Sequence, residues 1–355
     1  MTRRRFTQPG HTSVSVTAQI IGLVKNRLSG ITLSRHAYAD VLRTIYPDLI
    51  DSTVQEAQTL DCAINVWAAR PLSPLTLDQF GGRKFKGLNV WCLVLESTAL
   101  PARTQEAAEN ADQIWVPTTF VRNVCVKNGM PAKKLHVVPY HLPQPPRPRL
   151  EPGSKDPFTV LMSWDGRSSM NRKYVIGGVQ AFKKAWPRDN EVRLRLKTRD
   201  LSPENTALLT QAIGGDARIS IEDRFTETVD EIYDGAHVLL HPHRAEGYGR
   251  HMIEAMQRRL PVIATAYSGC MDWLRPDNAL LVDYTLIETR QQEYQYPQGG
   301  LWAEPDAQQL ADSLRACRWH YADLAPMLDR AELMAMRHTT LEHSRNAMLA
   351  ALKGA

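Results

Sequence analysis

The sequence predicts an α/β protein made of two parallel-sheet halves that face each other across a cleft. Short β-branched runs alternate with longer helical patterns, which is the order of elements in a parallel sheet covered by helices. A proline-rich stretch, PQPPRPRLEPGSKDP at residues 143–157, divides the chain. The length of 355 residues is enough for about two domains, each with its own core.

The first half contains four short apolar runs that are expected to be strands and two amphipathic patterns that are expected to be helices. With the proline-rich stretch they define an N-terminal domain of residues 1–150. The expected strands are Cys62–Trp67, Leu88–Leu95, Gln113–Val116 and Leu135–Val138, and the expected helices are Val16–Arg27 and Ala102–Ala111.

The second half repeats the alternation more regularly, and from about Pro305 its pattern is helical to the end. The expected strands are Phe158–Ser163, Val192–Lys197, Arg218–Ile221, Val238–His241, Val262–Thr265 and Ala279–Val282, with helices at about 173–186, 203–213, 227–235 and 250–259. Open α/β sheets bind ligands at the carboxyl ends of their strands. Two such sheets joined by a hinge therefore predict a ligand between them.

Composition and charge exclude several classes of protein. A hydrophobic content of 43% and a charged content of 23% exclude a disordered chain, and the longest apolar run, Val90–Leu95, is far too short to span a bilayer. The net charge of +5 is mild and scattered and decides nothing alone, but the chain lacks an aromatic-rich strand motif or a recognition-helix pattern, so no nucleic-acid partner is expected. The five cysteines form no Cys-x-x-Cys pair, which indicates free thiols in a cytoplasmic protein.

The densest chemical signal is HPHRAEGYGRHMIEAMQRRLPVIATAYSG at residues 241–269. Glu246 precedes a Gly-Tyr-Gly turn, and Glu254 follows eight positions later. Gly247 and Gly249 allow the backbone to turn sharply and to approach a ligand, and the helix expected after the turn directs unpaired N–H groups to the same point. An anionic ligand is favoured there, and a carboxylate on that helix can accept hydrogen bonds from two vicinal hydroxyls such as those of a ribose.

This motif resembles the retaining glycosyltransferases of family 4, which have the GT-B fold. The shared features are the glutamates that flank Gly-aromatic-Gly, followed by Glu-Ala-Met and Pro-Val-Ile-Ala-Thr. SWDGRSSMNRK at 163–173 is similar to the family's donor-phosphate segment. YSGCMDWLRPDNALLVDY at 267–284 and WAEPD at 302–306 are similar to a mannosyltransferase-like branch, as are, more loosely, LESTALP at 95–101 and ADQIWVPTTFVRNV at 111–124.

The resemblance covers about residues 88–315. Before that point the family's first strand and its glycine-rich loop are not located, and PGHTS at residues 9–13 is the candidate for that loop.

The resemblance implies roles on the donor side of the site. Glu246 would lie near the donor sugar, and the backbone of Gly247, Tyr248 and Gly249 would lie close to the sugar and the diphosphate. Glu254 would hold the ribose.

Cations would complete the donor site and replace a metal ion. The resemblance implies that Arg172 and Lys173 neutralise the diphosphate leaving group, with Arg167 as a third candidate, because cleavage of a glycosyl–phosphate bond builds negative charge on the diphosphate. Lys197, at a strand end, and His243, before the motif, are further donor-side candidates. The chain has no Asp-x-Asp sequence, so neither a metal nor another cofactor is expected.

The predicted architecture is therefore GT-B: two Rossmann-like domains that face each other across a cleft, with C-terminal helices. Residues 1–150 would bind the acceptor, with Glu96 on the acceptor side, and residues 151–318 would bind the nucleotide sugar. Residues 319–355 would be helices that pack back on the N-terminal domain.

The expected reaction is the retaining, metal-independent transfer of a hexose from a nucleoside diphosphate sugar. The acceptor would be a saccharide or a lipid-linked glycan in surface polysaccharide synthesis. GDP-mannose is the preferred donor, because of the mannosyltransferase-like segments, and a UDP-sugar is the second choice. The expected location is the cytoplasm, with peripheral contact to the anionic inner face of the membrane through basic residues of the first half as a further expectation.

Other functions stay open. A GT-B enzyme that epimerises or hydrolyses a nucleotide sugar would share the fold and the diphosphate site, and so would a non-catalytic sugar-nucleotide-binding module. A glycosidase would also use two carboxylates, but Glu246 precedes the helix and Glu254 lies within it, which suits different parts of one elongated ligand better. A metal at His241, His243 and His251 is not favoured, because their spacing is irregular.

Overall fold

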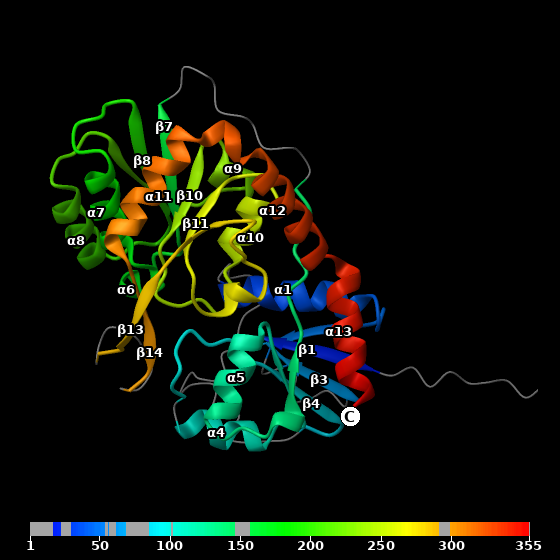
Figure 1. Cartoon of the computed structure of the whole chain (residues 1–355). Helices are drawn as coiled ribbons and strands as arrows, with labels where there is room; N and C mark the ends of the chain where they lie inside the picture. Colours follow the sequence, from blue (N-terminus) through cyan, green and yellow to red (C-terminus); the bar gives the residue numbers. More distant parts are fainter. Residues whose placement is uncertain are drawn as a thin grey trace, which may run out of the picture.

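A computed structural model describes residues 17–22, 30–53, 56, 62–68, 85–100, 102–145, 157–290 and 299–354. The candidate loop at residues 9–13 and the predicted domain boundary near residue 150 lie outside these ranges. Two α/β units lie one above the other, and the last two helices run along one side from the upper unit to the lower one (Figure 1).

The N-terminal domain is a sheet of six parallel strands with the order β2-β1-β3-β4-β5-β6. Its strands are β1 (Ala18–Gly22), β2 (Ile50–Thr53), β3 (Ile64–Trp67), β4 (Leu88–Cys92), β5 (Gln113–Val116) and β6 (Leu135–Val137). Its helices are α1 (Gly30–Arg43), α4 (Ala102–Glu109) and α5 (Thr119–Lys127), with a 3₁₀ turn η1 (Ala132–Lys134). The four strands and the helix predicted between residues 62 and 138 are present, with changes at their ends.

The first strand corrects one expectation. The segment Val16–Arg27 was expected to be a helix, but Ala18–Gly22 is strand β1, and all five of its residues are buried. β1 lies between β2 and β3 and is buried on both faces, so its residues show no alternation of buried and exposed positions. A short apolar run of this kind has the same sequence pattern as a buried helix, which explains the error.

The C-terminal domain is a second sheet of six parallel strands, with the order β12-β11-β10-β7-β8-β9. Its strands are β7 (Phe158–Ser163), β8 (Val192–Thr198), β9 (Ile219–Asp223), β10 (Val238–His241), β11 (Val262–Thr265) and β12 (Leu280–Val282). The helices are α6 (Met170–Lys173), α7 (Val175–Ala185), α8 (Pro203–Ile213), α9 (Asp230–Tyr233) and α10 (Arg250–Met256), with a 3₁₀ turn η2 (Gly269–Asp272). All six predicted strands are confirmed. The strand order reverses between β7 and β10, which is where sheets of this kind bind their ligands.

The chain ends in a hairpin and three helices. Strands β13 (Tyr284–Glu288) and β14 (Leu301–Pro305) pair antiparallel. Helices α11 (Ala307–Trp319), α12 (Ala325–His338) and α13 (Leu341–Lys353) follow, with a 3₁₀ turn η3 (Tyr321–Leu324) between the first two. α11 packs on α7, whereas α13 packs on α1 of the N-terminal domain. The side chain of Gln113 fixes this end of the chain by donating a 2.7 Å hydrogen bond to the carbonyl oxygen of Ala351.

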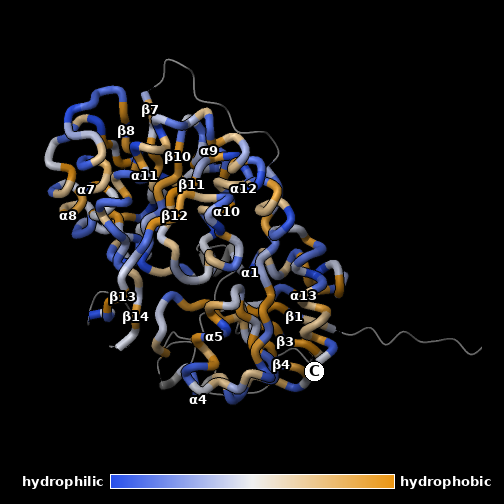
Figure 2. The backbone as a smooth tube through the Cα atoms, in the orientation of Figure 1, coloured by the Kyte–Doolittle hydropathy of each residue, from blue (hydrophilic) through white to orange (hydrophobic). Residues whose placement is uncertain are grey.

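The two domains share a hydrophobic core. Figure 2 shows apolar residues concentrated along the strands of both sheets, and one buried cluster contains residues of both domains. Within it the rings of Tyr140 and Tyr248 meet edge to face, with centroids 4.8 Å apart. The cleft-facing loops of the two domains are therefore packed against each other.

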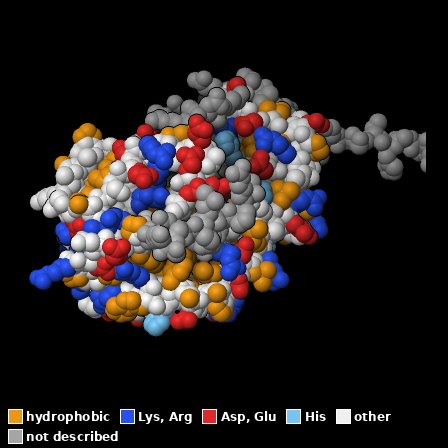
Figure 3. Space-filling view, turned by 90° about the horizontal axis from the view of Figure 1, so that it is seen from above, with side chains coloured by type: hydrophobic (Ala, Val, Ile, Leu, Met, Phe, Trp, Pro, Cys, Tyr) orange, Lys and Arg blue, Asp and Glu red, His pale blue; other side chains and the backbone are white. Residues whose placement is uncertain are grey.

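The surface carries charges of both signs. On the face shown in Figure 3, Lys and Arg side chains are interspersed with Asp and Glu side chains. None of the helices in the described part of the chain combines the length and the apolar character that a bilayer crossing requires.

Candidate active site

A cavity of about 850 Å³ lies where the carboxyl ends of the two sheets meet. Its walls include residues that follow β3 and β4 on one side and β7, β8 and β10 on the other. Ten of the eleven predicted site residues line it, namely Glu96, Arg167, Arg172, Lys173, Lys197, Glu246, Gly247, Tyr248, Gly249 and Glu254. The cavity lies at the ends of β7 and β10, between which the strand order reverses, as expected for this architecture.

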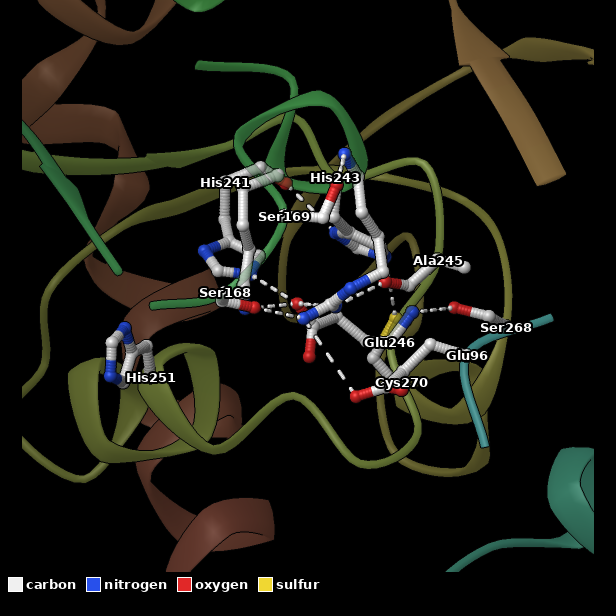
Figure 4. Close-up of polar contacts among 12 residues, drawn as sticks. Glu96, Ser168, Ser169, His241, His243, Ala245, Glu246, His251, Ser268 and Cys270 are labelled. Carbon is white, nitrogen blue, oxygen red and sulfur yellow. Dashed lines mark hydrogen bonds and ion pairs between the residues drawn. The ribbon is translucent and has the colours of Figure 1, made fainter. Parts of the chain in front are cut away.

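Glu246 is the centre of a buried ion cluster (Figure 4). Its Oε1 accepts a 3.0 Å hydrogen bond from Nη1 of Arg172 and a short one from Nζ of Lys173. Burial alone would raise the pKa of Glu246, but the charges of Lys173 and Arg172 and a hydrogen bond from His241 hold it well below the usual range. The carboxylate is therefore ionised at neutral pH.

Arg172 is held by groups of both domains. Ser169 caps α6 by accepting a hydrogen bond from the backbone N–H of Arg172 at 3.1 Å. The guanidinium donates to Oγ of Ser168 at 2.7 Å and to the carbonyl oxygen of Ala245 at 2.8 Å. Its Nη2 also lies 3.7 Å from Oε1 of Glu96, which follows β4 in the N-terminal domain. The predicted acceptor-side carboxylate and the predicted donor-side cation are thus neighbours across the cleft.

Lys173, the other cation, has little exposure. Burial lowers its pKa, and the Glu246 carboxylate opposes this shift. Two adjacent cations thus share the Glu246 carboxylate beyond the end of β7, and their remaining donors can bind an anion there.

Two histidines before the motif have different positions. Burial lowers the pKa of His241 to about 3, so its imidazole is neutral, and its Nε2–H donates to the ionised Glu246 at 3.3 Å. The prediction that His243 lines the cleft is wrong. His243 is fully buried, and its ring nitrogens lie 2.9 Å and 3.1 Å from the carbonyl oxygens of His241 and Tyr267. The buried ring of His243 therefore supports the loop before Glu246 through these two carbonyl oxygens.

Glu254 lies on α10 and is also buried. Its Oε1 accepts a 2.5 Å hydrogen bond from Nε of Arg250, and its Oε2 accepts a 3.0 Å one from the hydroxyl of Tyr233. Burial would raise the pKa of Glu254, but Arg250 and its other neighbours lower it. A carboxylate has about four acceptor positions, so it keeps capacity for a ligand hydroxyl.

The Gly-Tyr-Gly turn depends on both glycines. Gly249 has a φ of 87°, a conformation that other residues rarely adopt. A Cβ on Gly247 would lie 2.3 Å from Cγ2 of Val94, so the turn touches the N-terminal domain directly. Tyr248 is buried in the shared core and also contributes to the lining of the cavity.

Arg167 and Lys197 reach the cavity but are held by protein groups. Arg167 makes two hydrogen bonds to the carboxylate of Asp165, at 2.9 Å and 2.7 Å. These bonds help to lower the pKa of Asp165 to about 2, although its burial opposes this. Lys197 donates to carbonyl oxygens at 3.1 Å and 3.4 Å and to that of Arg224. Both cations therefore shape the wall of the cavity.

Sequence reasoning missed several residues of this site. Arg199 and Phe225 follow β8 and β9 and line the cavity, with the guanidinium 5.9 Å from the ring centroid. Their positions after strand ends were the available signal. Ser268 does not line the cavity, but its Oγ accepts a 2.8 Å hydrogen bond from the backbone N–H of Glu246. No sequence spacing predicts this contact between Ser268 and Glu246.

Metal binding has no obvious location in the described part of the chain. There, no group of three or more His, Cys, Asp or Glu side chains is arranged to hold an ion. Of the three histidines considered for this role, His251 has its Nδ1 2.8 Å from the carbonyl oxygen of Ser163. His241 and His243 have the partners described above.

Comparisons with known proteins agree with this geometry. Residues 162–317 match the family described as glycosyl transferases group 1, whereas no curated protein matches the sequence. Among solved structures, HepE (Alr3699) of Anabaena with bound UDP and glucose is similar, with a TM-score of 0.67 and 14% identity over 95% of this chain and 100% of that chain.

Two other structures show the same extent of likeness. A glycosyltransferase from Rickettsia africae has a TM-score of 0.67 and 14% identity over 96% of this chain and 100% of that one. The lipopolysaccharide outer core galactosyltransferase WaaB has a TM-score of 0.65 and 13% identity over 95% and 99%.

The fold is thus GT-B, as the sequence predicts. The predicted enzyme class, a glycosyltransferase, is supported by the match of residues 162–317 to the glycosyl transferases group 1 family.

Proposed function

We propose that this protein transfers a hexose from a nucleoside diphosphate sugar to a hydroxyl group of a saccharide or lipid-linked acceptor, with retention and without a metal ion. The observation that carries the proposal is the cluster of Glu246, Arg172 and Lys173. The cluster lies where the strand order of the C-terminal sheet reverses between β7 and β10, which is where sheets of this kind bind nucleotides, and it lines the cavity of about 850 Å³.

The cluster suits the departure of a diphosphate. Negative charge develops on the leaving group, and buried cations that are already in place stabilise it without reorganisation. Arg172 and Lys173 are held in position by α6 and by Glu246. The hydroxyls of the donor sugar can donate to Glu246, and those of the ribose can donate to Glu254.

The state of Glu246 disfavours a hydrolytic mechanism. A glycosidase needs one protonated carboxyl group as a general acid. Two cations keep Glu246 ionised, so it is poorly suited to donate a proton. In the proposed reaction the acceptor hydroxyl enters from the side of Glu96, and an oxygen of the departing phosphate takes its proton.

The donor base and sugar are part of the proposal. The mannosyltransferase-like segments of the sequence favour GDP-mannose. One solved structure of HepE holds UDP, and a second structure of HepE holds UDP-glucose. WaaB is a galactosyltransferase. These ligands favour a UDP-hexose as the first donor to test, with GDP-mannose second. A role in surface polysaccharide synthesis in the cytoplasm, at the membrane face, remains part of the proposal.

A donor screen tests the proposal. Thermal shifts with UDP, GDP and ADP and their hexose derivatives identify the nucleotide, and product analysis with the best donor is then run with and without saccharide acceptors. We expect a new glycoside only when an acceptor is present. Free sugar or an epimerised nucleotide sugar formed at full rate without an acceptor would contradict transfer and favour the hydrolase or epimerase. Binding without any turnover would favour the non-catalytic module.

A further inference from the structure

Ser268 has a backbone conformation that is nearly reserved for glycine. Its φ is 76° and its ψ is −153°. The other described residues with positive φ that are not glycine, Tyr174, Asp200 and Arg259, have φ values between 53° and 57°. In the region that Ser268 occupies, a side chain carries backbone strain, and strain of this kind persists only where the surroundings enforce it.

The hydroxyl of Ser268 is bound on both sides. Its Oγ accepts a 2.8 Å hydrogen bond from the backbone N–H of Glu246 and donates one of 2.5 Å to the carbonyl oxygen of Tyr267. The next residue, Gly269, donates from its backbone N–H to the carbonyl oxygen of Glu246 at 2.9 Å. The backbone donor and acceptor of Glu246 are thus both held by the Ser268-Gly269 pair; Figure 4 shows the contact of Ser268.

A glycine at position 268 would relieve the strain, but it would leave the buried N–H of Glu246 without this acceptor. A buried backbone donor that loses its partner is costly, and the loop would move to find another. The serine hydroxyl therefore stabilises the backbone of Glu246, whereas its side chain adds strain to the backbone at position 268.

We propose that Ser268 is a positioning residue for the reaction: its hydroxyl fixes the backbone of Glu246 so that the carboxylate stays between Arg172 and Lys173 and faces the donor. The inference rests on the proposed function for the role of Glu246. Ser268 does not line the cavity, so it acts through Glu246 and not by contact with substrate.

Two substitutions separate positioning from simple structural support. Ser268→Ala removes the hydroxyl and keeps the strain, whereas Ser268→Gly removes both. We expect the Tm of Ser268→Gly to lie about 2–4 °C above that of Ser268→Ala, because glycine adopts this conformation freely. We expect kcat to fall about tenfold in both variants, with the donor KM changed by less than about threefold.

The control is Ser344→Ala, which removes the hydroxyl of another buried serine, on α13 and outside the cavity. It should keep the wild-type kcat. If kcat instead follows Tm, so that Ser268→Gly is as active as the wild type, the hydroxyl is not needed and the proposal is overturned.

Crystal structures of the two Ser268 variants make the test independent of the proposed function. We expect the Glu246 carboxylate to leave hydrogen-bond distance of Arg172 in both. An unmoved carboxylate would overturn the positioning role even if the wild type transfers no sugar, whereas an inactive wild type with a displaced carboxylate in the variants would contradict only the proposed function.

Discussion

The hydroxyl of Thr118, at the start of α5 in the N-terminal domain, donates a 2.9 Å hydrogen bond to the carbonyl oxygen of Gly247 in the C-terminal domain. Next to it, the backbone N–H of Thr119 donates to Oδ2 of Asp272 in η2 at 2.6 Å. The loop that carries Glu246 is therefore fixed from the opposite domain, and the geometry of the cluster depends on how the two domains meet.

Thr118→Val should weaken both the fold and the reaction. The change removes the hydroxyl that caps α5 and leaves the carbonyl of Gly247 unpaired, at a cost of about 1–2 kcal/mol in the free energy of unfolding. We expect kcat to fall as well. The control is Thr340→Val, which removes the cap of α13 and should lower stability alone. Equal kcat values for the two variants would show that the link between the domains does not support catalysis.

Arg172→Lys keeps the positive charge but removes the planar guanidinium group with its several N–H donors. Arg172 contacts Ser168, Ala245 and Glu246 at once, and a lysine ammonium cannot reproduce these contacts together with a diphosphate. We expect kcat/KM for the donor to fall about 10–100-fold. Arg218→Lys, which changes a paired arginine outside the cavity, is the matched control. Steady-state kinetics of both variants decide the point, and an unchanged kcat/KM in Arg172→Lys would remove Arg172 from the donor site.

Phe225→Ala should weaken nucleotide binding without unfolding the protein. The ring is 55% exposed and lines the cavity beside Arg199, so it is available to stack on a base. Such stacking contributes about 1–3 kcal/mol, and we expect the Kd of the nucleotide, measured by calorimetry, to rise at least about fivefold. Leu208→Ala changes another exposed apolar residue, outside the cavity. A Kd that is the same in both variants would place the base elsewhere.

Stability should fall as the pH falls from 7 to 5. Burial lowers the pKa of His241 to about 3 in the folded state, whereas an unfolded histidine has a pKa of about 6.5. Between these values the unfolded state binds the extra proton, so acidification favours unfolding, by about 2 kcal/mol from this group at pH 5.

Histidine-to-glutamine variants test this pH dependence. His241→Gln should reduce the difference in Tm between pH 7 and pH 5, whereas His320→Gln, at an exposed position, should leave it as in the wild type. A pH dependence that His241→Gln does not change would show that His241 is not buried in its neutral form.

The parts of this structure differ in how far the sequence predicts them. The strands of the C-terminal sheet are short apolar runs separated by amphipathic helices, and all six were predictable. β1 was not, because its apolar residues are followed directly by Leu23 and Val24 in the sequence, so the segment has the spacing of a longer buried helix. The helix α1, the strand β2 and the hairpin of β13 and β14 were also not predicted.

The site shows the same division. Arg172, Lys173 and Glu246 were predictable because the segments that carry them resemble glycosyltransferase motifs, and the fold brings them together after β7 and β10, which are neighbours in the sheet. The position of His243 was not, since its partners include two carbonyl oxygens that only the folded loop brings to it. The contact of Ser268 with Glu246 likewise depends on the tertiary fold.

Turnover of Glu246→Gln tests the central claim most directly. The substitution keeps the shape of the side chain and removes the charge between Arg172 and Lys173. With the donor found in the screen, we expect kcat to fall at least about 100-fold. Asp216→Asn removes a paired carboxylate outside the cavity, and this control should keep the wild-type kcat. A folded Glu246→Gln variant with wild-type kcat would contradict the assignment of this cluster as the active site.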